Sequence, residues 1–305
     1  MPSVLPLVVR VSRPYYYLVT LWLYLMPTGG DYAVFLSYRF WLGAAYCTLP
    51  LNILCYLMND LADVATDFDN PRKGGSLLGA KESLATLQSL VPYAIAAQLP
   101  FLVAFAILIG PLTTILWFGA VFLVNWLYNF GPQLSTNYAP LDLVCPCGYL
   151  LVIPLSCWLS AAPPLPLRSW AHAITLVLRT QLWIQTFDVE GDKAAGRRNT
   201  AVRLGLRNSQ ALLALFLLNE NMLVYGAFKN WPLQSFSTIS LLMLAAQVAL
   251  APSTGAARGG SGGGGRNKAT KPALSPSNIQ ATFVILGLGG AGLMGRVWLD
   301  AAFVA

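Results

Sequence analysis

The sequence contains little charge. Asp, Glu, Lys and Arg together make up 10% of its 305 residues, whereas 56% are hydrophobic and the mean hydropathy is +0.59. Soluble domains carry about 25% charged residues, so this chain cannot cover a globular surface with charge. Helices that face lipid need no charge. The composition therefore excludes an ordinary soluble domain and predicts an all-α, polytopic integral membrane protein.

Histidine and paired cysteine are scarce as well. His172 is the only histidine and lies near the start of a predicted helix, which favours a structural role for that residue over Ser-His-Asp or Cys-His catalysis. All five cysteines lie in or beside apolar runs. Cys145 and Cys147 lack the second cysteine pair or nearby histidine that a zinc site needs, so they are interpreted as small packing residues.

The apolar runs indicate a single domain of about nine transmembrane helices over residues 1–305. A span needs about 20 residues, and Gly110-Pro111 separates two runs that together are too long for one span. A Gly-rich segment, 253–278, is predicted to be a flexible loop between the last two spans. The nine runs are 14–28, 34–58, 84–109, 111–128, 141–161, 167–187, 209–228, 232–252 and 279–303.

The basic residues predict the orientation of the chain. With nine spans and the N-terminus on the cytoplasmic (or matrix or stromal) side, 14 of the 19 Lys and Arg residues fall in inside segments. This distribution satisfies the positive-inside rule, so the net charge of +7 has a topological explanation. Because the sequence contains no basic stripe interleaved with aromatics, we expect no nucleic-acid partner. Whether the membrane is a bacterial plasma membrane or an organellar one stays open.

An acidic cluster, NDLADVATD, closes the second apolar run. On a continuing helix, Asn59, Asp63 and Asp67 fall within an arc of roughly 80°, with Asp60 at its edge. Like charges at this spacing repel one another, so the face needs a cation. Arg72 and Lys73 follow shortly after.

A second cluster, FDVEGDKAAGRRNT, closes the sixth run. Asp188 and Asp192 share a helical face, while Glu190 points elsewhere. Even-numbered runs end on the same side of the membrane, so the two clusters can converge on one site. Three basic residues follow here also: Lys193, Arg197 and Arg198.

Carboxylates and cations in this arrangement favour a magnesium and polyphosphate site. Mg²⁺ prefers oxygen ligands and commonly binds one or two carboxylates together with substrate phosphates. Lys and Arg complete such a clamp by binding phosphate oxygens. Acids and bases at helix ends can also form plain solvated loops, but two clusters of this kind on one side of the membrane favour a shared site.

The two motifs resemble the signatures of the UbiA superfamily of intramembrane prenyltransferases. Arg13-Pro14 and Tyr128-Asn129 also resemble family features, and the resemblance covers essentially the whole chain. It implies that isoprenyl diphosphate binds through two Mg²⁺ ions, the diphosphate leaves, and an acceptor attacks the allylic cation. The implied ligands of the Mg²⁺ ions are Asn59, Asp63, Asp67, Asp188 and Asp192.

The resemblance also implies further roles. Asp60, Asp63, Asp67, Asp188 and Asp192 form the implied catalytic set, and Arg72, Lys73, Lys193, Arg197 and Arg198 the implied diphosphate-binding set. Tyr128 and Asn129 are expected to line the pocket. One departure is that Ser135, Thr136 and Asn137 stand where family members often carry basic residues, which removes one cationic contact to the diphosphate or acceptor.

The partners expected from this hypothesis are an isoprenyl diphosphate, a lipophilic acceptor, for which an aromatic compound is favoured, and membrane lipid. A terpene cyclase of the same superfamily is an alternative, because it ionises the same substrate without an acceptor. An ion-coupled transporter is less favoured, because its acids would lie near the bilayer midplane and only Glu220 lies deep in a run. A CDP-alcohol phosphotransferase would need Asp-Gly and Ala-Arg elements that the first cluster lacks.

Overall fold

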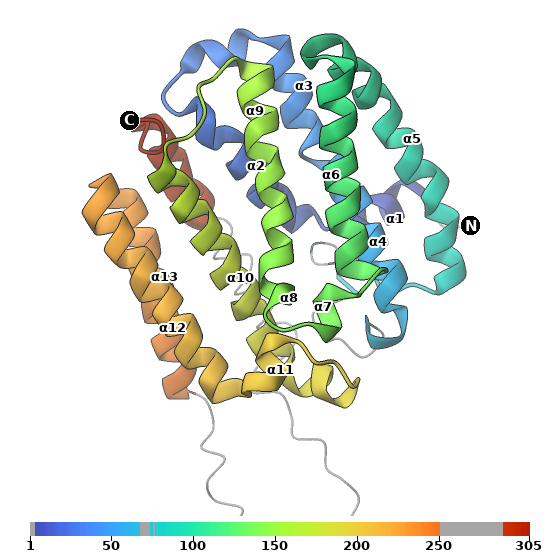
Figure 1. The fold of residues 1–305 in the computed structure, drawn as a ribbon, viewed down its shortest axis with the longest axis vertical. Helices are drawn as coiled ribbons and strands as arrows, with labels where there is room; N and C mark the ends of the chain where they lie inside the picture. The colour runs from blue at the N-terminus through green and yellow to red at the C-terminus, as the bar shows by residue number, and fades with distance from the viewer. Residues whose placement is uncertain (1–3, 68–73, 76, 78, 251–288) are drawn as a thin grey trace, which may run out of the picture.

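The computed structural model describes residues 4–67, 74–75, 77, 79–250 and 289–305, and every described regular element is helical. Figure 1 shows long helices running side by side between two ends of the molecule. The long helices are α4 (Leu49–Asp67), α5 (Leu84–Ile109), α6 (Pro111–Asn129), α10 (Leu167–Ala194), α12 (Leu206–Leu223) and α13 (Trp231–Leu250). Residues 289–299 are helical too.

Shorter elements connect and extend these helices. The short α-helices are α1 (Val4–Val11), α2 (Tyr17–Leu25), α3 (Tyr38–Tyr46), α7 (Leu134–Asn137), α8 (Leu141–Val144), α9 (Val152–Ser160) and α11 (Thr200–Leu204). The 3₁₀ segments are η1 (Pro14–Tyr16), η2 (Met26–Thr28), η3 (Tyr32–Leu36) and η4 (Cys145–Leu151), and η5 (Val224–Phe228) is a π-helical turn that extends α12.

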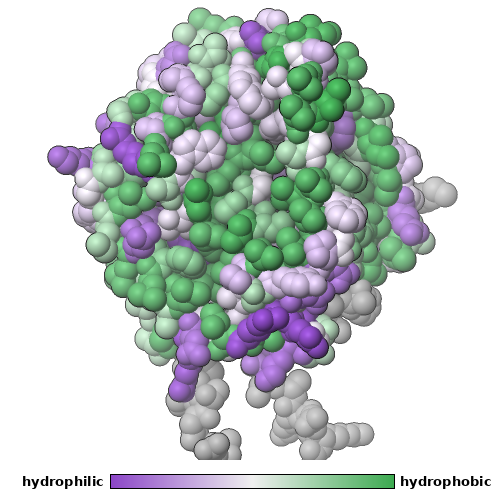
Figure 2. Space-filling model, in the orientation of Figure 1, coloured by the Kyte–Doolittle hydropathy of each residue, from purple (hydrophilic) through white to green (hydrophobic). Residues whose placement is uncertain are grey.

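Six helical segments of the described chain are long and apolar enough to cross a membrane. They are Tyr38–Val64, Leu84–Ile109, Pro111–Asn129, Leu141–Ser160, Leu206–Phe228 and Trp231–Ala249. The chain is thus an integral, multi-pass membrane protein. Figure 2 shows apolar residues over much of the body, with hydrophilic residues gathered at the end that carries α11.

Three of the nine predicted spans are not among the described helices that are long and apolar enough to cross a membrane. Run 14–28 contains the nine-residue α2 between two 3₁₀ turns, and run 167–187 lies in α10, which includes buried Arg179 and His172. Run 279–303 is described only from residue 289. The count of nine and the inside position of the N-terminus stay predictions. The predicted Gly-rich loop, 253–278, lies outside the described residues.

The break between α5 and α6 forms where Gly110-Pro111 predicts it. Gly110 has φ +92°, a value that side chains disfavour, and Pro111 occupies the first position of α6, where its missing N–H costs no hydrogen bond. The chain therefore reverses between two helices of 26 and 19 residues.

Toward their acidic ends, the two helices that carry the motifs pack in different hydrophobic clusters. Ile53 and Leu57 of α4 pack with residues of α1 and α5. Leu182 and Val189 of α10 pack with residues of α12 and α13. The ends of both helices lie at the end of the bundle where α7, α8 and α11 are found (Figure 1). Apolar packing thus holds each motif on its own side of a polar site.

Candidate active site

Both acidic motifs lie on continuous helices, as the spacing predicts. Helix α4 extends to Asp67, and α10 extends through Asp188 and Asp192 to Ala194. The backbone of Asp67 is described but its side chain is not, and Arg72 and Lys73 lie outside the described residues. The remaining predicted residues can be placed.

Arg13 anchors the first motif from the N-terminal segment. Its Nη2 donates to Asn59 Oδ1 at 2.8 Å and forms an ion pair with Asp60, which is 1% exposed. The guanidinium also lies 4.3 Å from the centre of the Tyr56 ring, where a cation is attracted by the aromatic face. Arg13 therefore joins the segment after α1 to the start of the acidic face.

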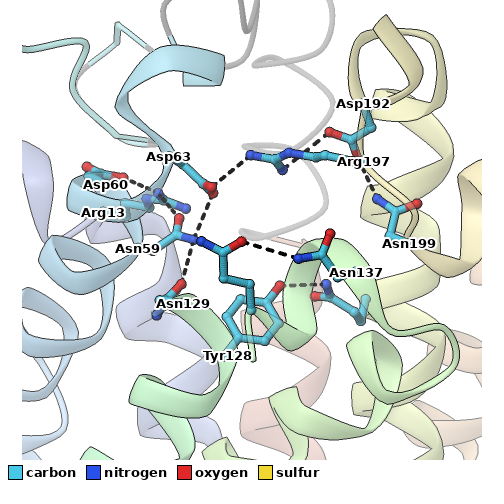
Figure 3. A network of polar contacts seen from close by, with 12 residues as sticks. Arg13, Asn59, Asp60, Asp63, Tyr128, Asn129, Asn137, Asp192, Arg197 and Asn199 are labelled. Atoms are coloured by element: carbon cyan, nitrogen blue, oxygen red, sulfur yellow. Dashed lines mark hydrogen bonds and ion pairs between the residues drawn. The ribbon is translucent and has the colours of Figure 1, made fainter. Parts of the chain in front are cut away.

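The side chain of Asn59 connects the first motif to the end of α6. Its Nδ2 donates to Asp63 Oδ2 and to Asn129 Oδ1, both at 3.1 Å. The preceding residue, Tyr128, accepts a hydrogen bond at 3.0 Å from Gln181 of α10. The predicted pocket residues Tyr128 and Asn129 thus lie between the two motif helices (Figure 3).

Arg197 joins the two motifs directly. Its Nη2 lies 2.8 Å from Asp63 Oδ1, and its Nη1 lies 3.3 Å from Asp192 Oδ1. Asn199 donates to the other oxygen of Asp192 at 2.6 Å and accepts from the N–H of Val202, which caps α11. Figure 3 shows this chain of contacts running from Asp63 through Arg197 to Asn199. One guanidinium therefore contacts a carboxylate from each motif.

Three other predicted residues lie near this network on the second motif. Asp188 is half-buried one turn before Asp192. Lys193 and Arg198 are exposed at the end of α10 and just beyond it. Glu190 is exposed too, as its helical position predicts. The second motif thus presents both half-buried acids and exposed bases at one end of the bundle.

Asp142 is a site residue that the sequence reasoning missed. It is 0% exposed and accepts hydrogen bonds from Gln185 Nε2 at 2.7 Å, from Thr200 N at 2.8 Å and from Thr200 Oγ1 at 2.6 Å. These bonds hold the start of α11 against α10. The available signal was an acid, in a chain with only 12, placed at the start of the predicted span 141–161.

The donors fit a magnesium site that is completed by a substrate. The described residues contain no group of three His, Cys, Asp or Glu side chains placed to hold a metal ion. They do bring Asp63 and Asp192 within reach of one cationic group, the guanidinium of Arg197. Mg²⁺ commonly takes one or two carboxylates and fills its other positions with water and phosphate oxygens, so this oxygen-donor set suits it.

A sequence model of the UbiA prenyltransferase family matches residues 16–257. The chain belongs to the UbiA prenyltransferase family. The family match covers both acidic motifs and every residue of the network except Arg13.

Two relatives of this chain have names that refer to carotenoids. The C(50) beta-cyclic carotenoids biosynthesis protein LbtBC of Dietzia sp. is 27% identical over 229 residues, which are 74% of this chain and 51% of the relative. A lycopene elongase/hydratase of Corynebacterium glutamicum is 32% identical over 105 residues, or 34% of this chain and 36% of the relative. The matched regions thus span about half and about a third of these relatives.

Solved structures of a UbiA homologue from Archaeoglobus fulgidus share the fold. The form bound to GPP and Mg²⁺ matches with a TM-score of 0.61 and 17% identity, covering 95% of this chain and 99% of the other. The form bound to DMAPP and Mg²⁺ matches with a TM-score of 0.58 and 17% identity, covering 96% and 99%. At this identity the likeness establishes the UbiA fold.

Proposed function

We propose that this UbiA-family chain transfers an isoprenyl group from a prenyl diphosphate to a lipophilic acceptor, with Mg²⁺ as the cofactor. The observation that carries the proposal is the convergence of Asp63 and Asp192, from two motifs about 130 residues apart, on one cation at the polar end of an apolar bundle. A diphosphate can bind there while its isoprenyl tail stays among apolar helices, where it is most soluble.

The two motifs supply the groups that would hold the metal and the diphosphate. Oxygen atoms of Asn59, Asp63, Asp67, Asp188 and Asp192 would hold Mg²⁺, which supplies positive charge to the leaving diphosphate. Arg197, Lys193 and Arg198 are placed to bind phosphate oxygens, and we assign the same role to Arg72 and Lys73. The support comes from the network in Figure 3 and from the magnesium bound by the Archaeoglobus homologue.

The reaction breaks one bond and forms another. The C–O bond between the prenyl group and the diphosphate breaks, and its electron pair leaves with the diphosphate. The allylic carbon then bonds to a nucleophilic atom of the acceptor, which finally loses a proton. Tyr128 lies beside the network, where the face of its ring can stabilise the allylic cation.

Two classes of lipophilic acceptor fit this proposal: an aromatic compound and a linear isoprenoid polyene. The sequence favours an aromatic acceptor through the family resemblance. A linear isoprenoid polyene is a second candidate, because the relatives above act in carotenoid biosynthesis and one is a lycopene elongase/hydratase. Helix α7 favours an uncharged acceptor, since Ser135 and Asn137 stand where family members often carry bases that would contact the diphosphate or acceptor.

The test incubates the purified chain with Mg²⁺ and with dimethylallyl or geranyl diphosphate, plus either lycopene or a panel of aromatic quinone precursors. Pyrophosphate release and product mass are both measured. We expect acceptor-dependent release and a product heavier by one prenyl unit. A cyclised hydrocarbon formed without acceptor would instead support a terpene cyclase.

Substitutions connect this activity to the two motifs. Asp63→Asn and Asp192→Asn should each lower turnover by at least about 100-fold. Each variant removes a negative charge that would hold Mg²⁺, and Mg²⁺ would supply positive charge to the leaving diphosphate. Glu190→Gln is the matched control, since Glu190 is an exposed acid of the same second motif, and it should retain activity. Near-normal turnover in both Asp variants would overturn the proposal.

A further inference from the structure

Arg197 is held over the end of its own helix by a tight turn. Helix α10 ends at Ala194, and Gly196, with φ +74°, reverses the chain. The N–H of Arg197 then donates to the carbonyl oxygen of Asp192 at 2.9 Å. The side chain is 18% exposed, so it lies in the network and not free in solvent. Local backbone geometry therefore directs this guanidinium at the carboxylates.

The ion pairs of Arg197 use the carboxylate atoms that a metal would need. One nitrogen contacts Oδ1 of Asp63 and the other contacts Oδ1 of Asp192. A divalent cation bound to either oxygen would compete for the same lone pairs and repel the guanidinium. Diphosphate provides the guanidinium with alternative acceptors of equal geometric fit, since Arg binds carboxylate and phosphate oxygens in the same forked manner.

We propose that Arg197 couples the binding of the metal to the binding of the diphosphate. Without diphosphate, its ion pairs with the two carboxylates compete with a metal ion for the same oxygen atoms. When metal and diphosphate bind together, the guanidinium pairs with phosphate oxygens instead. The inference rests on the proposed function, because it takes Asp63 and Asp192 as metal ligands. Thermodynamic linkage makes such coupling reciprocal: each ligand strengthens the binding of the other by the same factor.

The neighbouring bases do not share this geometry. Arg198 is exposed, and its backbone carbonyl accepts a hydrogen bond from Arg203 Nε at 3.1 Å. Lys193 is exposed on the last turn of α10. Among these three bases of the second motif, Arg197 is the one whose described ion pairs join Asp63 to Asp192.

The test measures Mn²⁺ binding to the full chain in detergent by electron paramagnetic resonance, with Mn²⁺ as the probe for the divalent cation. Binding is recorded with Mn²⁺ alone and with pyrophosphate, and the Mn²⁺–pyrophosphate complex in protein-free detergent is subtracted. In the wild-type chain, pyrophosphate should strengthen Mn²⁺ binding by about 10-fold or more, within the usual range of coupling between sites.

Arg197→Gln should bind Mn²⁺ alone at least about 5-fold more tightly than wild type, and pyrophosphate should then add less than about 3-fold. Arg197→Lys keeps the positive charge but loses the planar guanidinium that can contact two oxygen atoms at once, so it should retain part of the coupling. Arg207→Gln removes an exposed basic charge on the first turn of α12, outside the diphosphate-binding set, and should match wild type, which excludes a general electrostatic effect.

Two results would count against the proposal, and they can be told apart. If Arg197→Gln binds Mn²⁺ as wild type does, with the same gain from pyrophosphate, the coupling role is overturned while the metal site stands. If the wild-type chain binds no Mn²⁺ with or without pyrophosphate, the metal site itself is wrong, and the proposed function fails together with the coupling.

Discussion

Asp60 and Asp63 are three residues apart on α4 but have different partners. Asp63 contacts Arg197 across the site, whereas Asp60 is buried against Arg13. Both belong to the catalytic set that the family resemblance implies. The contacts favour a positioning role for Asp60, because its pair with Arg13 also brings Arg13 to the side-chain oxygen of Asn59. On the acidic face of α4, Asp60 therefore anchors the N-terminal segment, while Asp63 faces the site.

Arg13→Gln should destabilise the chain, because it leaves a buried carboxylate without its arginine. Loss of one member of a buried pair costs about 3–5 kcal/mol, whereas an exposed pair contributes about 0–1 kcal/mol. The matched control is Arg10→Gln, since Arg10 pairs with Glu82 and is 39% exposed. Thermal unfolding in detergent measures both. Equal stability of the two variants would contradict the anchoring role, and Arg13→Gln combined with Asp60→Asn should recover part of the loss.

Helix α10 carries charged residues both at its C-terminal end and in its buried middle part. Its last turns contribute Asp188 and Asp192 to the site, while Arg179 lies buried farther back in the helix. Arg179 forms an ion pair with Glu220 of α12, and His172 Nδ1 lies 3.6 Å from the same carboxylate. Glu220 is 0% exposed. An interhelical ion pair therefore accounts for the one acid that the sequence places deep in an apolar run.

The Arg179–Glu220 pair should fix the register of α10 against α12. Glu220→Gln leaves a buried guanidinium without its carboxylate and should cost about 3–5 kcal/mol of stability. The double variant Arg179→Met with Glu220→Leu removes both charges and should lie close to wild type, because buried pairs are often replaceable by apolar groups. Denaturation in mixed micelles provides the comparison. A double variant less stable than Glu220→Gln would show that the ion pair itself drives the packing.

At the scale of the whole molecule, the polar site lies at one end of an apolar bundle. The hydrophilic residues at the α11 end in Figure 2 mark the side that the basic residues assign to the inside. Lipid can then solvate the helices while the site meets water. This arrangement suits an enzyme whose substrate has a charged head and an apolar tail.

The predicted topology places the two termini on opposite sides of the membrane. Nine spans with the N-terminus inside put the motifs inside and the C-terminus outside. Paired reporters, one active only inside and one only outside, should therefore respond oppositely when fused at Met1 and at Ala305. Reporters at both ends that respond alike would contradict an odd number of spans. A reporter inserted after Gly196 would show the side of the motifs independently.

The sequence by itself determined the helical membrane class, the break at Gly110-Pro111 and the helical faces of Asn59, Asp63, Asp188 and Asp192. Those features depend on local hydropathy and on the period of one helix, which neighbouring residues encode. The order of the predicted spans placed both motifs on one side of the membrane, and family likeness added the two Mg²⁺ ions and the diphosphate that the motifs are expected to bind.

Only the tertiary structure decided which polar groups meet. Arg13 pairs with Asp60, Arg197 bridges Asp63 and Asp192, and Asp142 holds the start of α11. Apart from the local pair of Arg197 with Asp192, these contacts join elements that are far apart in sequence, and hydrophobic packing of the helices sets their approach. A single sequence shows that a charge exists, but its partner depends on how helices pack, because a buried charge is stable only where the fold brings it an opposite one.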